Sequence, residues 1–231
     1  MPSIGVVGAG AAAAAATFVI EQTVGDAEVT VLEKSGGLCG RAATRRRGPV
    51  TYDYGANYVK DDDPRVTELL TETLDSDGLV DTAGPIYAYE ADGEIHEGRD
   101  SDDHKWSYEA GLTQIAKRLL GETDATVHRR TRVETVHREG EQWRLTDTDG
   151  ETWGPFDVLL LNPPAPQTAQ LLRDAEWDAD LREDLVAAVD AVPYRSVWTA
   201  VLHYPFELDR PYYAVINTDK DHEIGWLSRE E

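Results

Sequence analysis

The sequence predicts an α/β fold in which one domain, built on a parallel sheet from separated segments, is interleaved with a second, α+β domain. The first 33 residues run strand–helix–strand, and both strands are apolar along their length, as in parallel sheets covered on both faces. A similar apolar run recurs much later, at 156–161. Amphipathic helices and short strands occupy the chain between and after these segments, so we expect pieces of two domains to alternate.

The chain opens with a strand–helix–strand unit. Ile4–Val7 is a short apolar run that ends at Gly8-Ala9-Gly10. Residues 11–22 have the length and alanine content of a helix. Residues 28–33 are β-branched and apolar, which is typical of a second strand. A strand–helix–strand unit of this kind needs one sheet to contain both strands.

The middle of the chain mixes loops, helices and a hairpin. Pro64 is placed for the first turn of a helix, and Ala91-Asp92-Gly93 is a turn signal. Apolar residues at 112, 115, 116 and 119 share one helical face. The expected elements are a loop at 34–48, a helix at 64–74, a hairpin of 87–89 with 94–96, an acidic loop at 100–103 and a helix at 111–120.

The remaining elements return to sheet strands and then leave them again. Alternating residues predict short strands, Asp149-Gly150 predicts a turn, and Asn162-Pro163-Pro164 ends the apolar run at 156–161. The expected strands and helices are strands at 126–128, 132–136, 143–146 and 156–161, helices at 167–173 and 181–192, and strands at 197–204 and 212–217.

Composition and charge exclude several classes of protein. Hydrophobic residues make up 41% of the 231 residues and charged residues 29%, which excludes wholesale disorder. Lys and Arg number 22 against 44 Asp and Glu, so the net charge is −22. Nucleic acids and anionic membranes both require a positive surface, so we expect neither as a partner. A small-molecule substrate is expected instead, and the oligomeric state stays open.

The acidic residues are spread along the chain, and arginine outnumbers lysine by 17 to 5. This composition favours a protein from a high-salt cytoplasm, in which salt screens the self-repulsion of the carboxylates; an ordinary acidic protein is the alternative. We therefore expect the melting temperature to rise between dilute buffer and molar KCl. A melting temperature that does not change over that range contradicts the halophilic interpretation.

Cysteine, histidine and the N-terminus bear on localisation. The single Cys39 cannot form an internal disulfide, and the six histidines lack the spacing of metal ligands, so no metal site is expected. Residues 4–20 are apolar, but they lack the basic flank of a signal peptide and are short for a membrane span. A cytoplasmic protein is the expectation.

The turn after the first strand has the pattern of a dinucleotide-binding fingerprint. Gly8, Gly10 and Ala13 form GxGxxA, in which Gly8 permits the tight turn and Gly10 lets the backbone approach a pyrophosphate. Ala13 is small enough for the helix to lie close to the strand. Glu33 ends the second strand, where its carboxylate can accept hydrogen bonds from a ribose. The predicted domain is therefore of the Rossmann type.

NAD and FAD share this fingerprint, and the segment after Glu33 favours FAD. Residues 34–45 are rich in glycine and include Arg41, and a loop of this kind can wrap the rest of a long dinucleotide. Such a loop would be surplus for NAD. Residues 52–58, Tyr-Asp-Tyr-Gly-Ala-Asn-Tyr, follow it.

With these segments the chain resembles the FAD-dependent oxidoreductases of the amine oxidase superfamily, and within it the renalase-like proteins. The likeness rests on 33–45, on 52–58, on the Pro-Ala-Pro-Gln turn that ends 157–167, and on the order of these motifs along nearly the whole chain. A more distant resemblance to prenylcysteine oxidases covers the first sixty residues. The resemblance implies an FAD-binding domain at 1–64 and 108–168, and a substrate domain at 65–107 and 169–231.

The resemblance also implies which residues hold FAD. Gly8, Gly10 and Ala13 are expected at the pyrophosphate, Glu33 at the ribose, and Arg41 beside the pyrophosphate and ribityl chain. The backbone of Val133 is expected at the adenine. The full set of expected cofactor-binding residues is Gly8, Gly10, Ala11, Ala13, Glu33, Lys34, Gly40, Arg41, Gly55, Ala56, Asn57 and Val133, with Gly55–Asn57 near the isoalloxazine ring.

Two features depart from the family pattern. Cys39 occupies the position of a glycine, where a Cβ costs about 1 kcal/mol if φ is positive. Family members also continue beyond the point where this chain ends, so we expect an incomplete substrate domain.

The expected activity is hydride transfer from a reduced nicotinamide or an amine to flavin N5, with oxygen as the acceptor. Flavin chemistry asks little of side chains, so no catalytic residue is assigned. Tyr58, Trp198 and Trp226 are the candidate substrate residues, with Trp106 and Tyr213 as further aromatic candidates. Two alternatives stay open: an NAD(P)-dependent dehydrogenase and a non-catalytic nucleotide-binding remnant.

Overall fold

The computed structural model describes residues 1–82, 84–98 and 103–229. These residues form two compact units that exchange chain with one another. Unit 1 comprises 1–43 and 113–198, and unit 2 comprises 44–112 and 199–231. Of the residues that the resemblance implies for an FAD-binding domain, 44–64 and 108–112 lie in unit 2. Of those that it implies for a substrate domain, 169–198 lie in unit 1.

Unit 1 is built on a four-stranded parallel sheet, which confirms the predicted α/β class. The strands β1 (Ser3–Val7), β2 (Glu28–Glu33), β10 (Thr126–Arg129) and β14 (Val158–Leu161) lie in the order β10-β2-β1-β14. From β1 the chain continues through the helix α1 (Ala11–Thr23) to β2 on one side, while β14 arrives on the other. The strand order therefore reverses at β1, and in open α/β sheets such a reversal is where ligands bind.

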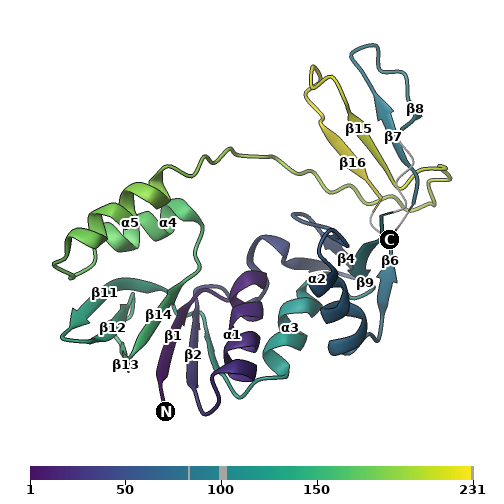
Figure 1. Cartoon of the computed structure of the whole chain (residues 1–231). Helices are drawn as coiled ribbons and strands as arrows, with labels where there is room; N and C mark the ends of the chain where they lie inside the picture. Colours follow the sequence, from purple (N-terminus) through teal and green to yellow (C-terminus); the bar gives the residue numbers. More distant parts are fainter. Residues whose placement is uncertain (83, 99–102, 230–231) are drawn as a thin grey trace. The chain divides into compact units, whose positions relative to one another are not determined.

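The two faces of this sheet are covered by different elements (Figure 1). The helix α1 and α3 (Thr113–Gly121) contact each other on one face. An antiparallel meander of β11 (Val133–Glu139), β12 (Gln142–Asp147) and β13 (Thr152–Phe156) covers the other. A buried cluster joins the sheet to the meander: Val7, Leu32, Val133, Val136, Leu145, Phe156 and Ala175.

A single glycine sets how closely the meander approaches the sheet. A Cβ on Gly5 would lie 2.7 Å from Cδ2 of Phe156, whose ring belongs to the buried cluster. Gly5→Ala is therefore expected to lower the free energy of unfolding by about 1–3 kcal/mol, because the packed ring has to move. Urea denaturation measures this effect. Gly121→Ala is the control, since a Cβ there meets nothing within 4 Å, and equal stability of both variants would contradict this account.

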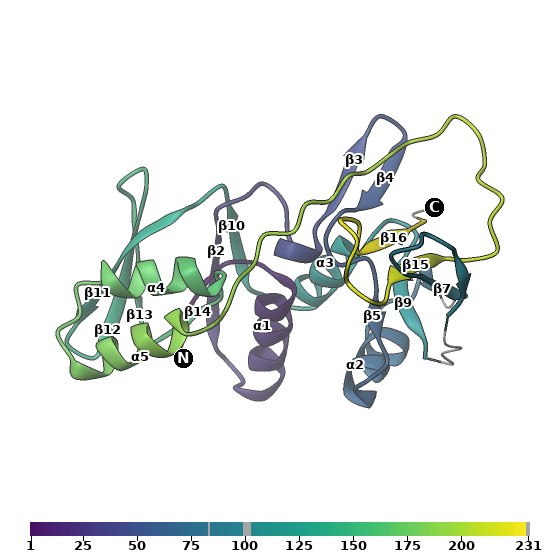
Figure 2. The same cartoon turned by 90° about the horizontal axis from the view of Figure 1, so that it is seen from above.

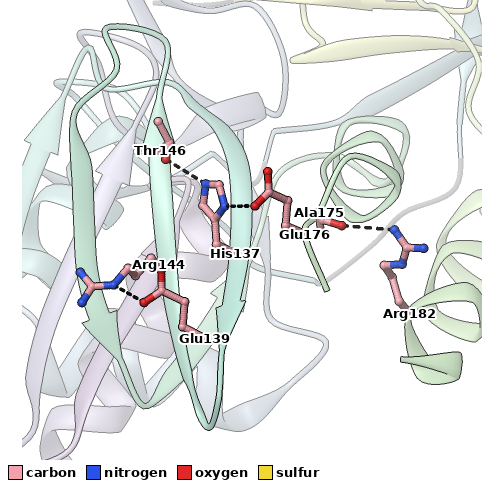
Figure 3. Close-up of polar contacts among 7 residues, drawn as sticks. All are labelled: His137, Glu139, Arg144, Thr146, Ala175, Glu176 and Arg182. Carbon is pink, nitrogen blue, oxygen red and sulfur yellow. Dashed lines mark hydrogen bonds and ion pairs between the residues drawn. The ribbon is translucent and has the colours of Figure 1, made fainter. Parts of the chain in front are cut away.

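The helices α4 (Ala165–Arg173) and α5 (Asp180–Asp190) pack together and are tied to the meander (Figure 3). His137 on β11 contacts Glu176 Oε2 through Nδ1 and Thr146 Oγ1 through Nε2, both at 2.9 Å. The Glu176 N–H donates to Val136 O, and Arg182 on α5 donates to Ala175 O. The predicted helix 167–173 is confirmed, and the predicted helix 181–192 ends at 190.

After α5 the chain is extended and exposed, and the predicted strand 197–204 is wrong. All residues from 191 to 211 are exposed, and this fully described stretch contains neither helix nor strand (Figure 2). Residues 197–204 alternate as a strand does, but no described strand offers them backbone hydrogen bonds. A strand pattern becomes a strand only when another strand supplies those bonds.

Unit 2 contains three small sheets, and one of them corrects the sequence prediction. β3 (Thr44–Arg47) and β4 (Val50–Asp53) form a hairpin across part of the segment 34–48 that was predicted as a loop. The sequence does not predict β3 as a strand, because three of its four residues are exposed arginines and apolar and polar residues do not alternate in it. The strand is instead stabilised by its antiparallel pairing with β4.

The other sheets of unit 2 combine distant segments. One has the order β5-β9-β6 and the other β16-β15-β7-β8. The predicted hairpin is present as β7 and β8, but its second strand is His96–Glu97 and not 94–96. The predicted strand 212–217 is present as β15, which begins at Ala214. The bounds are β5 Val59–Lys60, β6 Leu79–Asp81, β7 Ile86–Tyr89, β8 His96–Glu97, β9 Lys105–Tyr108, β15 Ala214–Asn217 and β16 Trp226–Ser228.

The predicted helix 64–74 is present in two parts. The helix α2 (Pro64–Glu68) is capped by Asp63, whose side chain accepts a hydrogen bond from the Arg65 N–H. A π-helical turn continues it over Leu69–Thr73. The predicted acidic loop at 100–103 lies, apart from Asp103, outside the described residues.

Candidate dinucleotide-binding site

The fingerprint turn lies at the carboxyl end of β1. Gly8 has φ +95°, a left-handed conformation that favours glycine, and its N–H donates to Leu32 O at 2.8 Å. Gly10 precedes α1, and its carbonyl accepts from the Ala14 N–H at 2.9 Å. Among the described residues no side chain caps α1, and its first turn contains no acidic residue. Gly10 and Cys39 form an isolated parallel bridge, so the Ala11 N–H lies against the Cys39 backbone. The next N–H groups of α1, that of Ala13 among them, have no partner within the helix and are available to an anion.

A second turn approaches the fingerprint closely. The Cys39 N–H donates to Ala9 O at 2.9 Å, and a Cβ on Gly40 would lie 3.2 Å from the Cα of Gly10. A Cβ on Gly10 would lie 3.3 Å from Oδ1 of Asn162. Side chains are thus absent from Gly10 and Gly40 at the point where two backbones and an amide meet. This is the geometry required for a pyrophosphate to approach the main chain.

Cys39 shows the consequence of the departure noted in the sequence. Its φ is +76°, and it is almost fully buried. Because φ is positive, the Cβ of Cys39 costs about 1 kcal/mol relative to a glycine at this position.

Glu33 has a structural role beside its expected one. The side chain is buried at the end of β2. Its Oε2 accepts from the Ala9 N–H and its Oε1 from the Ser35 N–H, each at 2.7 Å. The carboxylate therefore ties the fingerprint turn to the loop after β2. Each oxygen keeps a second lone pair with which to accept a ribose hydroxyl.

Asn162, which the sequence pattern marks only as the end of a strand, belongs to this candidate site. It follows β14, its N–H donates to Val7 O at 2.9 Å, and its side-chain oxygen faces Gly10. Its position at the carboxyl end of the strand beside β1 was the available signal, because that is the reversal point of the sheet.

Two cations lie at the rim of the site. Lys34 Nζ donates to Gln167 Oε1 on α4 at 2.7 Å. Arg41 follows Gly40 in a short 3-10 turn, is exposed, and has its guanidinium carbon 5.9 Å from the centre of the Tyr194 ring. Both side chains are exposed on the surface of unit 1.

Val133 is buried at the start of β11, opposite Asp147 on β12. The Asp147 carboxylate accepts from the N–H groups of Asp149 and Glu151, and from Nε1 of Trp153 at 3.0 Å. These donors, with Trp153 foremost, hold the pKa of Asp147 below its ordinary value of 3.8. The start of β11, which is expected to meet the adenine, therefore pairs with a residue of β12 whose carboxylate holds the following turn by hydrogen bonds.

This lowered pKa predicts a pH dependence of stability. A carboxylate whose folded pKa is depressed stabilises the fold above the unfolded value, and the contribution is lost as the pH falls through the folded value. Asp147→Asn should therefore lower the melting temperature at pH 7, and the difference from the wild type should shrink below pH 3.8. Thermal unfolding at several pH values tests this, and a difference that does not depend on pH would contradict it.

The residues expected at the flavin end lie in unit 2. Gly55 and Ala56 are exposed, and the Asn57 amide donates to Tyr213 Oη at 3.2 Å and to Ser228 Oγ at 3.1 Å. Their proximity to an isoalloxazine ring stays a prediction.

The candidate substrate residues divide between the two units, with Trp198 in unit 1 and the others in unit 2. Trp198 is 97% exposed in the extended segment, so it lines no cavity here. Tyr58 meets Tyr213 edge to face at 6.5 Å, and Trp226 lies on β16. Unit 2 contains a cavity of about 770 Å³ lined by residues that include Asp53, Ser107, Tyr108, Tyr212 and Tyr213. Of the five aromatic candidates only Tyr213 lines it.

Among the residues that the structure describes, no group of three or more His, Cys, Asp or Glu side chains could hold a metal ion. Of the helices described, none has the length and apolar character needed to cross a membrane.

Comparison with known proteins gives one family match and several similar structures. Residues 6–73 match the NAD(P)-binding Rossmann-like domain. A protein described as a candidate protoporphyrinogen oxidase from Exiguobacterium sp. 255-15 has a TM-score of 0.69 and 16% identity, with 98% of this chain and 72% of that chain covered.

Two further structures are less completely covered. A CLA-producing fatty acid isomerase from P. acnes has a TM-score of 0.63 and 16% identity over 79% of this chain and 63% of that one. A variant of putrescine oxidase, redesigned in its cofactor binding, has a TM-score of 0.61 and 12% identity, with 80% of this chain and 64% of that chain covered. The chain thus spans less than two thirds of these two proteins. At such identities the likeness establishes the fold.

Proposed function

We propose that this chain binds FAD in unit 1 and belongs to an FAD-dependent oxidoreductase of the renalase-like and amine oxidase type. The uncapped N-terminus of α1, which faces a turn without side chains at Gly10 and Gly40, is the observation that carries the proposal. FAD, when bound, supplies an isoalloxazine ring that accepts a hydride at N5, here from a reduced nicotinamide or an amine, with oxygen as the final acceptor.

The residues of unit 1 fit the adenosine and pyrophosphate parts of this cofactor. The N–H groups at the start of α1 would bind the pyrophosphate, and Asn162 would border it. Glu33 would accept the ribose hydroxyls while keeping its bonds to Ala9 and Ser35. The backbone of Val133 would orient the adenine. Among the residues of unit 2, Gly55–Asn57 are proposed for the flavin end.

The contact between Cys39 and Ala9 favours FAD over NAD. It brings the loop after β2 back against the fingerprint turn, as expected of a loop that wraps a long dinucleotide. The match of residues 6–73 to an NAD(P)-binding domain favours the second candidate, an NAD(P)-dependent dehydrogenase. The fingerprint itself serves both cofactors.

Mass spectrometry of the ligand released from protein purified without added nucleotide tests the proposal. We expect FAD, together with flavin absorbance of the native protein. Release of NAD or NADP would favour the dehydrogenase. Failure of the apo-protein to bind added FAD would overturn the proposal.

Reduction of bound flavin by a substrate distinguishes an enzyme from a non-catalytic remnant. Loss of flavin absorbance after anaerobic addition of NADH or NADPH would support the reduced nicotinamide as substrate, and loss after an amine would support the amine. If no donor reduces the flavin absorbance, the chain is a non-catalytic protein that binds the cofactor. A cytoplasm of high salt concentration is proposed as the setting, on the charge of −22.

A further inference from the structure

The turn after β10 is attached to the loop that carries Glu33. Arg129 lies opposite Glu33 in the register of β10 and β2. The Arg130 N–H then donates to Ser35 O at 3.0 Å, and the Thr131 N–H donates to Glu33 O at 2.9 Å. Arg130 is thereby fixed beside the ribose-binding end of β2 by its backbone.

The conformation of Arg130 directs its side chain over this loop. Its φ is +61°, the left-handed region that an arginine enters at a cost of about 1 kcal/mol. The guanidinium lies against Gly36: its Nε is 3.5 Å and its Nη2 3.8 Å from the place of a Cβ on that glycine. Because Gly36 has no side chain, this space stays open to the arginine.

The Arg130 guanidinium forms no ion pair with the acidic residues that the structure describes. The chain has 44 acidic residues, yet within the described ranges no carboxylate or carbonyl bonds with the exposed guanidinium. The adjacent carboxylate, that of Glu33, is buried and engaged by Ala9 and Ser35. A planar cation is thus held at the edge of the adenosine-binding region, with no ionic or hydrogen-bonding partner among the residues at 1–82, 84–98 and 103–229.

The strand order identifies which part of a dinucleotide this cation meets. The phosphate-binding N–H groups follow β1, whereas Arg130 follows β10, which is separated from β1 by β2. Neighbouring strands are about 4.8 Å apart, so Arg130 lies roughly two strand spacings from the pyrophosphate position. The base, beyond the ribose at Glu33, is the part that reaches this distance.

We propose that the Arg130 guanidinium stacks on the adenine of the bound dinucleotide and is a further cofactor-binding group of this site. The inference rests on the proposed function. A guanidinium plane stacks on aromatic faces in a way that an ammonium does not, and such contacts add to affinity without hydrogen bonds to the base.

The test uses the apo-protein, isothermal titration calorimetry, and ADP and FAD as probes. Arg130→Gly is the informative variant, because glycine adopts φ +61° without strain while the guanidinium is lost. We expect about fivefold weaker binding of both ADP and FAD, with an apo melting temperature equal to or above that of the wild type. Arg130→Lys should lose most of the same affinity, since charge remains and the plane does not.

Arg132→Ala is the matched control, an exposed arginine two residues away whose side chain has no role in the proposal. It should bind both probes as the wild type does. Wild-type affinity of Arg130→Gly for ADP would overturn the inference and leave the FAD proposal standing. A wild-type protein that binds ADP but not FAD would overturn the proposed function, and the ADP comparison would still decide the role of Arg130. A wild type that binds neither would overturn both.

Discussion

Gly10→Val is expected to abolish dinucleotide binding while unit 1 stays folded. The φ of Gly10 is −68°, which valine accepts, so the backbone is not strained. The new side chain would instead enter the space between Gly10, Gly40 and Asn162, where a Cβ already lies 3.3 Å from the Asn162 amide oxygen. The pyrophosphate could no longer reach the N–H groups of α1. We expect FAD affinity to fall by at least about 100-fold, equivalent to about 2.7 kcal/mol.

Titration of the apo-protein with FAD measures this loss, and circular dichroism reports the fold. Gly121→Val is the control, since its Cβ meets nothing within 4 Å and the residue lies at the end of α3. Retention of adenine nucleotide by Gly10→Val at wild-type occupancy would show that the fingerprint turn is not the binding site.

Glu33→Ala is expected to weaken both the fold and the cofactor complex. The substitution leaves the N–H groups of Ala9 and Ser35 without their acceptor, and each had bonded to a buried carboxylate. Hydrogen bonds to charged groups contribute about 1.5–3 kcal/mol each, so a loss of about 3 kcal/mol in the free energy of unfolding is expected. Loss of the ribose acceptor should lower FAD affinity by a further ~1–3 kcal/mol.

Urea denaturation of the apo-protein separates the first effect from the second. Glu28→Ala, at the exposed start of the same strand, should change neither quantity. Apo stability equal to that of the wild type would mean that the Glu33 carboxylate does not tie the two turns together. Unchanged FAD affinity in a folded Glu33→Ala variant would remove the ribose assignment.

The first strand–helix–strand unit could be predicted from the sequence because its determinants are local. Apolar β-branched runs specify β1 and β2, alanines specify α1, and Gly8 permits the turn between them. The fingerprint and Glu33 follow from the same short segment, so the cofactor class could be inferred without tertiary contacts. The later run 156–161 was recognisable as a strand from its apolar residues, but it is not buried on both faces. Phe156 ends β13, and β14 is an edge strand whose Val158 is 52% exposed.

Other features depend on which segments pair with one another, and the residue pattern alone misjudged them. The alternation at 197–204 predicted a strand, which is absent because no described strand pairs with it, while the arginines of β3 concealed a strand that β4 stabilises. Asn162 and Arg130 became site residues only when β14 and β10 placed them beside Gly10 and Gly36.

The sequence by itself determined the parallel-sheet unit, its glycine turn and the acid after β2, because each depends on neighbouring residues and the hydrophobic pattern. Only the tertiary structure decided which groups surround that turn and which extended segments become strands. Both are set by hydrogen bonds and close approaches between segments, some of them neighbours in the chain, as β3 and β4 are, and others more than a hundred residues apart, as Gly10 and Asn162 are. Such contacts have no period or motif in the chain from which they could be predicted.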